Sequence, residues 1–186
     1  CYLLEEVEAV HAFYVTLADF HIELIKIAKK YYGADVITFH DDMGTQISSF
    51  MSPDTYAEIL LPHYQKMNQA AHEMGVLMNY HSCGCVGNQI ENFIEAGFDY
   101  WEGQDACNDK LAIMEKYGDK LGQVSIFMPD PELSDEDFAK VVEKQVRDMG
   151  QKGKYIIWFG DMKPGRSVNG EEIIYKVSRQ MYEGEE

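Results

Sequence analysis

Five short apolar segments alternate with segments of helical periodicity along this chain, and this alternation limits the possible folds more than any other feature of the sequence. The five segments, which read as buried strands, are ADVITFHDD, VLMNYHSCG, FDYWEGQ, QVSIFM and KYIIWFG. Strands that alternate with helices form parallel βαβ units with right-handed crossovers. The sequence therefore predicts an α/β fold with a parallel sheet. No linker or low-complexity segment divides residues 1–186, so a single domain is expected.

Local start and stop signals place the ends of several predicted helices. A long amphipathic helix opens the chain and is expected to end at Gly33, a residue type that commonly caps helix C-termini. Ser52 followed by Pro53 is typical of an N-cap and a first helical position, and Pro62 is expected to bend the helix that follows. Ser134, with an acidic residue three positions later, forms a variant of the capping box. These signals agree with the strand–helix alternation.

Polar side chains gather where the predicted strands end. The residues at these ends are His40, Asp41, Asp42, His81, Cys83, Glu102, Gln104, Asp105, Asp130 and Asp161. The first strand is followed by HDDMGTQ and not by the GxGxxG turn of a dinucleotide-binding fold. Periodicity alone fits both a doubly wound sheet and a barrel, but the carboxyl ends of the strands form the rim where parallel barrels build their active sites.

The charge balance excludes several classes of partner. The chain carries 16 Lys and Arg residues against 32 Asp and Glu residues, and its net charge of -16 repels nucleic-acid phosphates and anionic lipids. It contains no apolar run long enough to span a membrane, and its opening CYLLEEVEAV does not resemble a secretory signal. We therefore expect no nucleic-acid or membrane partner and a cytoplasmic location.

Two of the four cysteines cluster beside a histidine in the segment YHSCGC. In a chain of cytosolic composition, Cys83 and Cys85 next to His81 favour metal or redox chemistry over a disulfide framework. His81 and Cys83 are two residues apart on a strand, so they point to the same side and can bind one ion, for which zinc suits both donors. The simpler alternative is that these are buried groups at a strand end, since free cysteine behaves as a small hydrophobic residue.

Three stretches resemble the uroporphyrinogen decarboxylase superfamily when they are taken together. They are FHDDMGTQISSFMSPDTYAEILLPHYQKM, GVLMNYHSCG and FDYWEGQDACNDKLAIMEKYGDKL. The resemblance implies a parallel (β/α)8 barrel of the TIM type, of which this chain holds about the last five βα units. Residues 1–186 would then be the C-terminal part of such a barrel, without its first three strands.

The segment HSCG is similar to one branch of the superfamily, the corrinoid:thiol methyltransferases, which includes the methylcobalamin:coenzyme M methyltransferases. In that branch a His-x-Cys pair at the end of this strand and a distant second cysteine bind zinc. The resemblance therefore implies Zn²⁺ at His81 and Cys83. The distant cysteine is missing, because the chain reads IIWFGDMKPG near its last strand. Cys85 is the expected third ligand, with Asp161 or Glu102 as alternatives that donate oxygen, although none of the three matches the family motif.

The function implied by this resemblance is zinc-dependent methyl transfer from a methylated corrinoid (methylcobalamin) to a small thiol or related acceptor. A partner corrinoid protein would deliver the cobalamin, and no residue of this sequence can be assigned to binding it. Asp41, Asp42, Gln104 and Asn108 are the expected catalytic residues, which orient the substrate or support the metal ligands. The simpler reading of all four is as loop, turn or helix-cap residues.

Two other functions remain open from the sequence. The first is uroporphyrinogen decarboxylation, which needs no metal but needs a basic pocket for a substrate with many carboxylates. The chain has only three arginines, Arg147, Arg166 and Arg179, and none is among the strand-end residues. The second is a non-catalytic partial barrel that acts as a binding module. Its open strand edges would favour a homo-oligomer or pairing with the missing N-terminal half.

Overall fold

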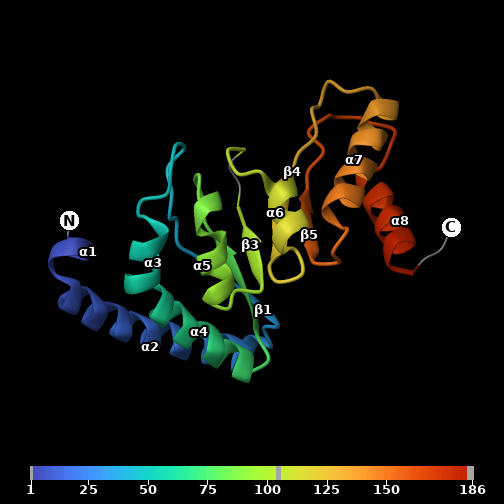
Figure 1. The fold of residues 1–186 in the computed structure, drawn as a ribbon. Coiled ribbons are helices and arrows are strands. Elements are labelled where there is room, and N and C mark those ends of the chain that lie inside the picture. The colour runs from blue at the N-terminus through green and yellow to red at the C-terminus, as the bar shows by residue number, and fades with distance from the viewer. Residues whose placement is uncertain (1, 104–105, 184–186) are drawn as a thin grey trace. The chain divides into compact units, whose positions relative to one another are not determined.

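A computed structural model describes residues 2–103 and 106–183 of the chain (Figure 1). The chain divides into two compact units, residues 1–108 and residues 109–186. The expectation of a single domain stays a prediction.

The first unit is a parallel sheet of three strands with its connecting helices. Its elements are α1 (Tyr2–Glu5), α2 (Val7–Tyr32), β1 (Val36–His40), α3 (Pro53–Ile59), α4 (Leu61–Glu73), β2 (Leu77–His81), the 3-10 turn η1 (Gly87–Gln89), α5 (Ile90–Glu95) and β3 (Tyr100–Glu102). Strand β1 pairs with β2 and β2 pairs with β3, both in parallel. The parallel α/β arrangement expected from the alternation of segments is confirmed.

The register of these strands sorts their side chains into rows. His40 lies opposite His81, and His81 lies opposite Glu102. One residue earlier, Phe39 lies opposite Tyr80 and Tyr80 opposite Trp101. Because successive strand residues point to opposite faces, the polar row and the aromatic row occupy the two faces of the sheet.

The aromatic face of the sheet forms the core of the first unit. Tyr80 and Trp101 are fully buried. The ring of Tyr80 lies 4.5 Å from the ring of Phe98 and 4.7 Å from that of Phe93, measured between centroids. Burial of side chains of this size contributes about 1.5–3 kcal/mol each to stability. The helices that follow β1 and β2 are therefore held on one face, and the polar row is left to the other.

The predicted helix ends are confirmed in this unit. Gly33 caps α2 in the left-handed conformation, with φ of 64°. Ser52 caps α3 and accepts a hydrogen bond from a backbone N–H of the first turn, with Pro53 as the first helical residue. Pro62 lies in the first turn of α4, where the helix is interrupted after Ile59. The opening helix differs from the expectation, because it is divided into α1 and α2.

The second unit contains two strands and three helices. Its elements are α6 (Lys110–Tyr117), β4 (Gly122–Phe127), α7 (Asp135–Met149), β5 (Tyr155–Phe159) and α8 (Gly170–Glu183). Strands β4 and β5 pair in parallel, and α7 packs against α8 (Figure 1). Ser134 caps α7 by accepting a hydrogen bond of 3.1 Å from the N–H of Asp137, as the capping box predicted.

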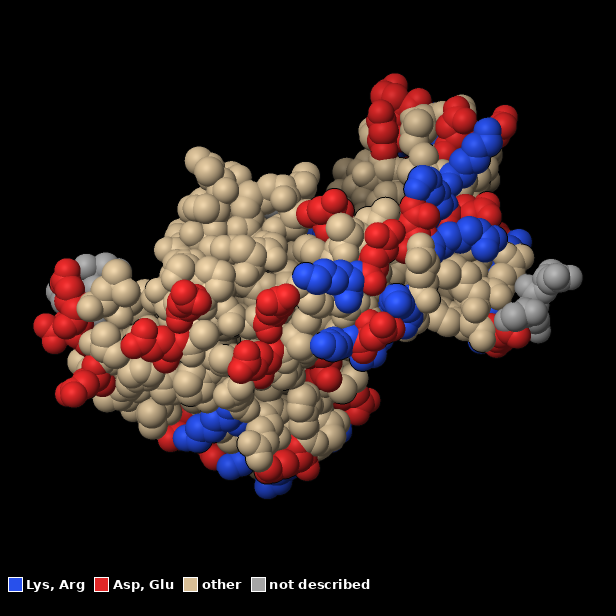
Figure 2. Space-filling view, viewed as in Figure 1, with Lys and Arg blue, Asp and Glu red and all other residues tan. Residues whose placement is uncertain are grey.

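The surface is acidic, but its charges are not spread evenly. Figure 2 shows Asp and Glu side chains over much of the visible face, whereas the end of the first unit formed by the loops after β1 and β2 is free of charged side chains in this view. None of the described helices combines the length and the apolar character that crossing a bilayer requires.

Candidate metal centre

Asp42, His81 and Cys83 bring three potential ligand atoms together at the carboxyl ends of β1 and β2. The Sγ of Cys83 lies 3.4 Å from Nε2 of His81, and Oδ1 of Asp42 lies 3.6 Å from the same nitrogen. All three atoms lie within 4.8 Å of one another, and no other group of this kind occurs in residues 2–103 and 106–183. Neighbouring ligands of a tetrahedral zinc ion lie about 3.3–3.6 Å apart, given the usual Zn–N and Zn–S bond lengths. The donor set and its spacing therefore fit zinc.

Strand geometry explains why His81 and Cys83 face the same way. His81 is the last residue of β2 and is 7% exposed, and Cys83 follows two residues later. The predicted pairing of these two side chains is thus present in the structure. Asp42 reaches them from the neighbouring strand end, and its Oδ1 also accepts a hydrogen bond of 2.8 Å from the backbone N–H of Cys83. The Asp42 carboxylate therefore links the carboxyl ends of β1 and β2 next to the imidazole of His81.

Glu102 supports His81 from the other side of the ring. Its Oε1 lies 3.0 Å from Nδ1 of His81, and both side chains are nearly buried. A hydrogen bond from Nδ1–H to this carboxylate leaves the lone pair of Nε2 directed toward Cys83 and Asp42, as metal-binding histidines require. Glu102, which the sequence offered as an alternative ligand, thus occupies the supporting position behind the imidazole.

The polar contacts continue along the same face of the sheet. The amide of Asn79 donates to Oε2 of Glu102 at 3.3 Å and to Oγ1 of Thr38 at 3.1 Å. The ring of His40 stacks on that of His81, with 4.4 Å between centroids. The sequence named no partner for His40, because this contact depends on the register of β1 against β2.

Asp41 and Asp42 have different environments although they are adjacent. The Oδ2 of Asp41 accepts a hydrogen bond from the hydroxyl of Tyr64 on α4. Burial raises the pKa of Asp41, and the nearby charge of Asp42 adds to that increase, against the opposing effect of the Tyr64 hydrogen bond. The carboxylate of Asp41 therefore contacts helix α4, and of the two aspartates only Asp42 lies beside His81 and Cys83.

Asn108 acts on the backbone of the loop after β2. It is 6% exposed, and its Oδ1 accepts from the N–H groups of Val86 and Gly87 at 3.0 and 2.9 Å. Its Nδ2 donates to the carbonyl of Gly84 at 2.8 Å. These three bonds leave little capacity for a substrate, and the N-cap of α6 is Asp109. Asn108 is therefore a positioning residue for the loop that carries Cys83.

Two glycines let the loops after β1 and β2 touch. Gly84 has a φ of 89°, a conformation that side chains rarely adopt, and a Cβ at this position would lie 2.3 Å from the carbonyl carbon of Gly44. The N–H of Cys85 also donates to the carbonyl of Thr45 at 2.7 Å. The segments that carry Asp42 and Cys83 are thus joined by direct backbone contact.

The expected role of Cys85 as the third metal ligand is wrong in this structure. Cys85 forms a disulfide with Cys107, and their Cα atoms are 5.6 Å apart. The pairing arises because β2 and β3 are neighbours, which places the loops after them side by side although the cysteines are 22 residues apart. Among the described residues, Cys83 is the cysteine outside a disulfide, and Asp42 is the third potential donor beside it and His81.

Gln104 and Asp161 were the remaining candidates from the sequence. Gln104, an expected catalytic residue, falls outside the described residues. Asp161, the other alternative oxygen ligand, follows β5 in the second unit, where its Oδ2 accepts from Nε of Arg166 at 3.0 Å.

Comparison with solved structures shows the fold to which this chain is similar. A methyltransferase from Methanosarcina mazei matches with a TM-score of 0.67 and 15% sequence identity. The match covers 97% of this chain but 52% of the methyltransferase, so the chain spans about half the length of that protein. This likeness confirms the expectation of a partial parallel barrel. A search of curated proteins finds no match to this sequence.

A family model that matches nearly the whole sequence identifies the family. The sequence model described as "Uroporphyrinogen decarboxylase (URO-D)" matches residues 2–183. This range includes both units and every residue of the candidate metal centre. The chain therefore belongs to the uroporphyrinogen decarboxylase (URO-D) family.

Proposed function

We propose that this chain carries the zinc-binding part of a methyltransferase that transfers a methyl group from a methylated corrinoid to a thiol acceptor. The observation that carries the proposal is the convergence of Asp42, His81 and Cys83 at the carboxyl ends of two parallel strands. Active sites of parallel barrels lie at this end of the strands. The methyltransferase among the solved structures supports the reaction class, and the corrinoid and its carrier protein rest on the family resemblance.

Three protein ligands suit a catalytic zinc site better than a structural one. Structural zinc has four protein ligands, whereas catalytic zinc has three and keeps one position for water or substrate. Zinc bound here would lower the pKa of an acceptor thiol, so that the thiolate is present at neutral pH.

The residues of this chain would hold the ligands in place. Glu102 fixes the tautomer of His81 through its contact of 3.0 Å with Nδ1. Asn108 and the Cys85–Cys107 disulfide fix the loop on which Cys83 lies. Ligands prepared in this way lose little conformational entropy when metal or substrate binds.

Uroporphyrinogen decarboxylation is less well supported, because the arginines of this chain are already paired. Arg147 and Arg179 form ion pairs within their own helices, with Glu143 and Glu183. The third, Arg166, is the one in a loop that follows a strand.

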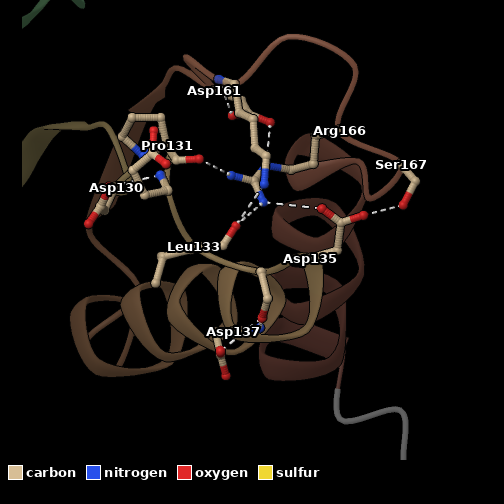
Figure 3. A network of polar contacts seen from close by, with 11 residues as sticks. Asp130, Pro131, Leu133, Asp135, Asp137, Asp161, Arg166 and Ser167 are labelled. Atoms are coloured by element: carbon tan, nitrogen blue, oxygen red, sulfur yellow. Dashed lines mark hydrogen bonds and ion pairs between the residues drawn. The ribbon is translucent and has the colours of Figure 1, made fainter.

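Arg166 is enclosed by acceptors (Figure 3). Its side chain is 2% exposed, and its guanidinium contacts Asp161 at 3.0 Å and Asp135 at 3.3 Å. It also donates to the carbonyls of Leu133 and Pro131. Two carboxylates neutralise its charge, so it offers little to a substrate with many carboxylates.

A zinc measurement tests the proposal. The purified chain is expected to bind about one zinc ion, as measured by metal analysis after dialysis, and His81→Ala and Cys83→Ser are expected to lose it. The matched control is His72→Ala, because His72 lies on α4 and contacts Asp99 at 2.9 Å instead. Full zinc content in both ligand variants would refute the site. Zinc binding without methyl transfer to any thiol, with a methylated corrinoid supplied, would favour the non-catalytic binding module.

A further inference from the structure

The strands that build the candidate metal centre bring almost no positive charge with them. Residues 31–109 contain twelve Asp and Glu residues but a single Lys or Arg, Lys66. Lys66 lies on α4, where its ammonium group pairs with Asp19 of α2. The charge of Lys66 is therefore compensated by a carboxylate at the contact between α2 and α4. The carboxyl ends of β1, β2 and β3 carry no Lys or Arg at all.

The loops beside the metal centre are uncharged. Residues 43–53 and residues 82–90 contain no Asp, Glu, Lys or Arg. Ile47 and Phe50 on the first of these loops are 90% and 63% exposed. In Figure 2 this end of the first unit is tan, as the sequence of the loops requires. No cation from these loops can offset a negative charge on a bound substrate.

The charges at the centre itself sum to a negative value. With a zinc ion of charge 2+, the Asp42 carboxylate and the Cys83 thiolate balance the metal, and Glu102, 12% exposed, adds one negative charge beside it. A substrate thiolate adds another. In a partly buried site, such charges are weakly screened by solvent.

We infer that this site selects thiol acceptors whose remaining part is neutral or positively charged, and that it disfavours thiols bearing a carboxylate or sulfonate. The inference rests on the proposed function, because it concerns the acceptor of the same site. It follows from the position of Glu102 behind His81 and from the absence of Lys and Arg at the ends of these three strands.

Cobalt can report thiol binding without any turnover. Co²⁺ substitutes for Zn²⁺ in sites of this type, and a sulfur ligand gives it a charge-transfer absorption. The cobalt-loaded chain is titrated with three thiols of matched length, 2-aminoethanethiol, 2-mercaptoethanol and 3-mercaptopropionate. The three differ in the charge of the group remote from sulfur, and a dissociation constant is obtained for each.

The thiols also differ in their own acidity, so the diagnostic quantity is a comparison between variants. We take the ratio of the Kd of 3-mercaptopropionate to that of 2-aminoethanethiol in the wild type and in Glu102→Gln. Glutamine keeps an oxygen that can accept from Nδ1 of His81, but it removes the charge. The ratio is expected to fall about fivefold to tenfold in Glu102→Gln at low salt, since attraction of the ammonium and repulsion of the carboxylate are both lost. Glu73→Gln, an exposed residue at the end of α4 that precedes β2, is the matched control and should leave the ratio unchanged.

The outcomes separate the inference from the proposed function. If cobalt gives no sulfur charge-transfer band, or no thiol alters it, the proposed metal–thiol function fails and the inference fails with it. If the thiols bind but Glu102→Gln leaves the ratio as it is in the wild type, only the inference on acceptor charge is overturned. A fall in the ratio that is specific to Glu102→Gln and shrinks at high salt supports it.

Discussion

Asn108 offers a sharp test of whether a residue near the metal centre serves the loop or the substrate. Its side chain makes three hydrogen bonds to the backbone of the loop after β2, at 2.8 to 3.0 Å. Asn108→Ala would leave two N–H groups and one carbonyl without these partners. Each lost bond costs about 1 kcal/mol, so we expect the free energy of unfolding to fall by about 3 kcal/mol.

The assay must report on the first unit alone. Trp101 is fully buried in this unit, whereas Trp158 on β5 is 64% exposed. In a Trp158→Phe background, urea unfolding followed by tryptophan fluorescence therefore reports on Trp101. Asn88→Ala is the matched control, since Asn88 is an exposed residue that makes one hydrogen bond to Ser49, and we expect it to cost no more than about 0.5 kcal/mol.

Substitution by aspartate sharpens the result. Asn108→Asp keeps an oxygen for the N–H groups of Val86 and Gly87 but loses the donor to Gly84, so its stability should lie between those of wild type and Asn108→Ala. Asn108→Ala should also weaken zinc binding, because the loop that carries Cys83 loses support. If Asn108→Ala were as stable as Asn88→Ala and bound zinc normally, but lost activity, Asn108 would face the substrate and would not be a positioning residue for the loop.

Three further predictions concern the disulfide, Asp41 and Arg166. Cys85→Ser and Cys107→Ser each open the Cys85–Cys107 disulfide, which joins cysteines 22 residues apart, and each should lower stability in urea unfolding by about 3 kcal/mol. Both should weaken zinc binding to the same extent, because the loop that carries Cys83 loses the same support; zinc lost in Cys85→Ser but kept in Cys107→Ser would restore Cys85 as a ligand. Burial raises the pKa of Asp41 above its usual 3.8, so the stability contributed by its protonated form is complete below pH 3.8 and is lost as pH rises through the folded pKa. The stability of Asp41→Asn relative to wild type should therefore increase from about pH 4 to about pH 8, and a constant difference in urea unfolding would contradict this assignment. Arg166→Lys should cost about 2–3 kcal/mol in unfolding followed by Trp158 fluorescence, because one ammonium group cannot reach all the acceptors around the guanidinium; a loss below about 0.5 kcal/mol would show that the contacts in Figure 3 are weak.

The parts of the fold that depend on nearby residues could be predicted from the sequence. Ser52 with Pro53, Gly33 and Ser134 each set a helix end through contacts within one turn, and the structure places all of them as expected. The pairing of His81 with Cys83 belongs to the same class, since it requires only that strand residues two positions apart share a face.

The parts of the site that depend on strand register could not be predicted. Asp41 and Asp42 look alike in the sequence, and only the alignment of β1 with β2 shows that Asp42 is the one beside His81. In the same way, Glu102 reaches His81 because β3 pairs with β2. The Cys85–Cys107 pair joins two loops, and nothing in the local sequence of either reveals the other.

The contact between Gly44 and Gly84 has a consequence for protein engineering. Backbone touches backbone at this point, two residues from Asp42 on one side and one residue from Cys83 on the other. An insertion beside either glycine would displace Asp42 and Cys83 together, whereas residues 46–48, at the tip of the first loop, are separated from that contact by the turn between Thr45 and Ser48. Loop grafts or affinity tags intended to spare metal binding should therefore be introduced at the tip and not at its base.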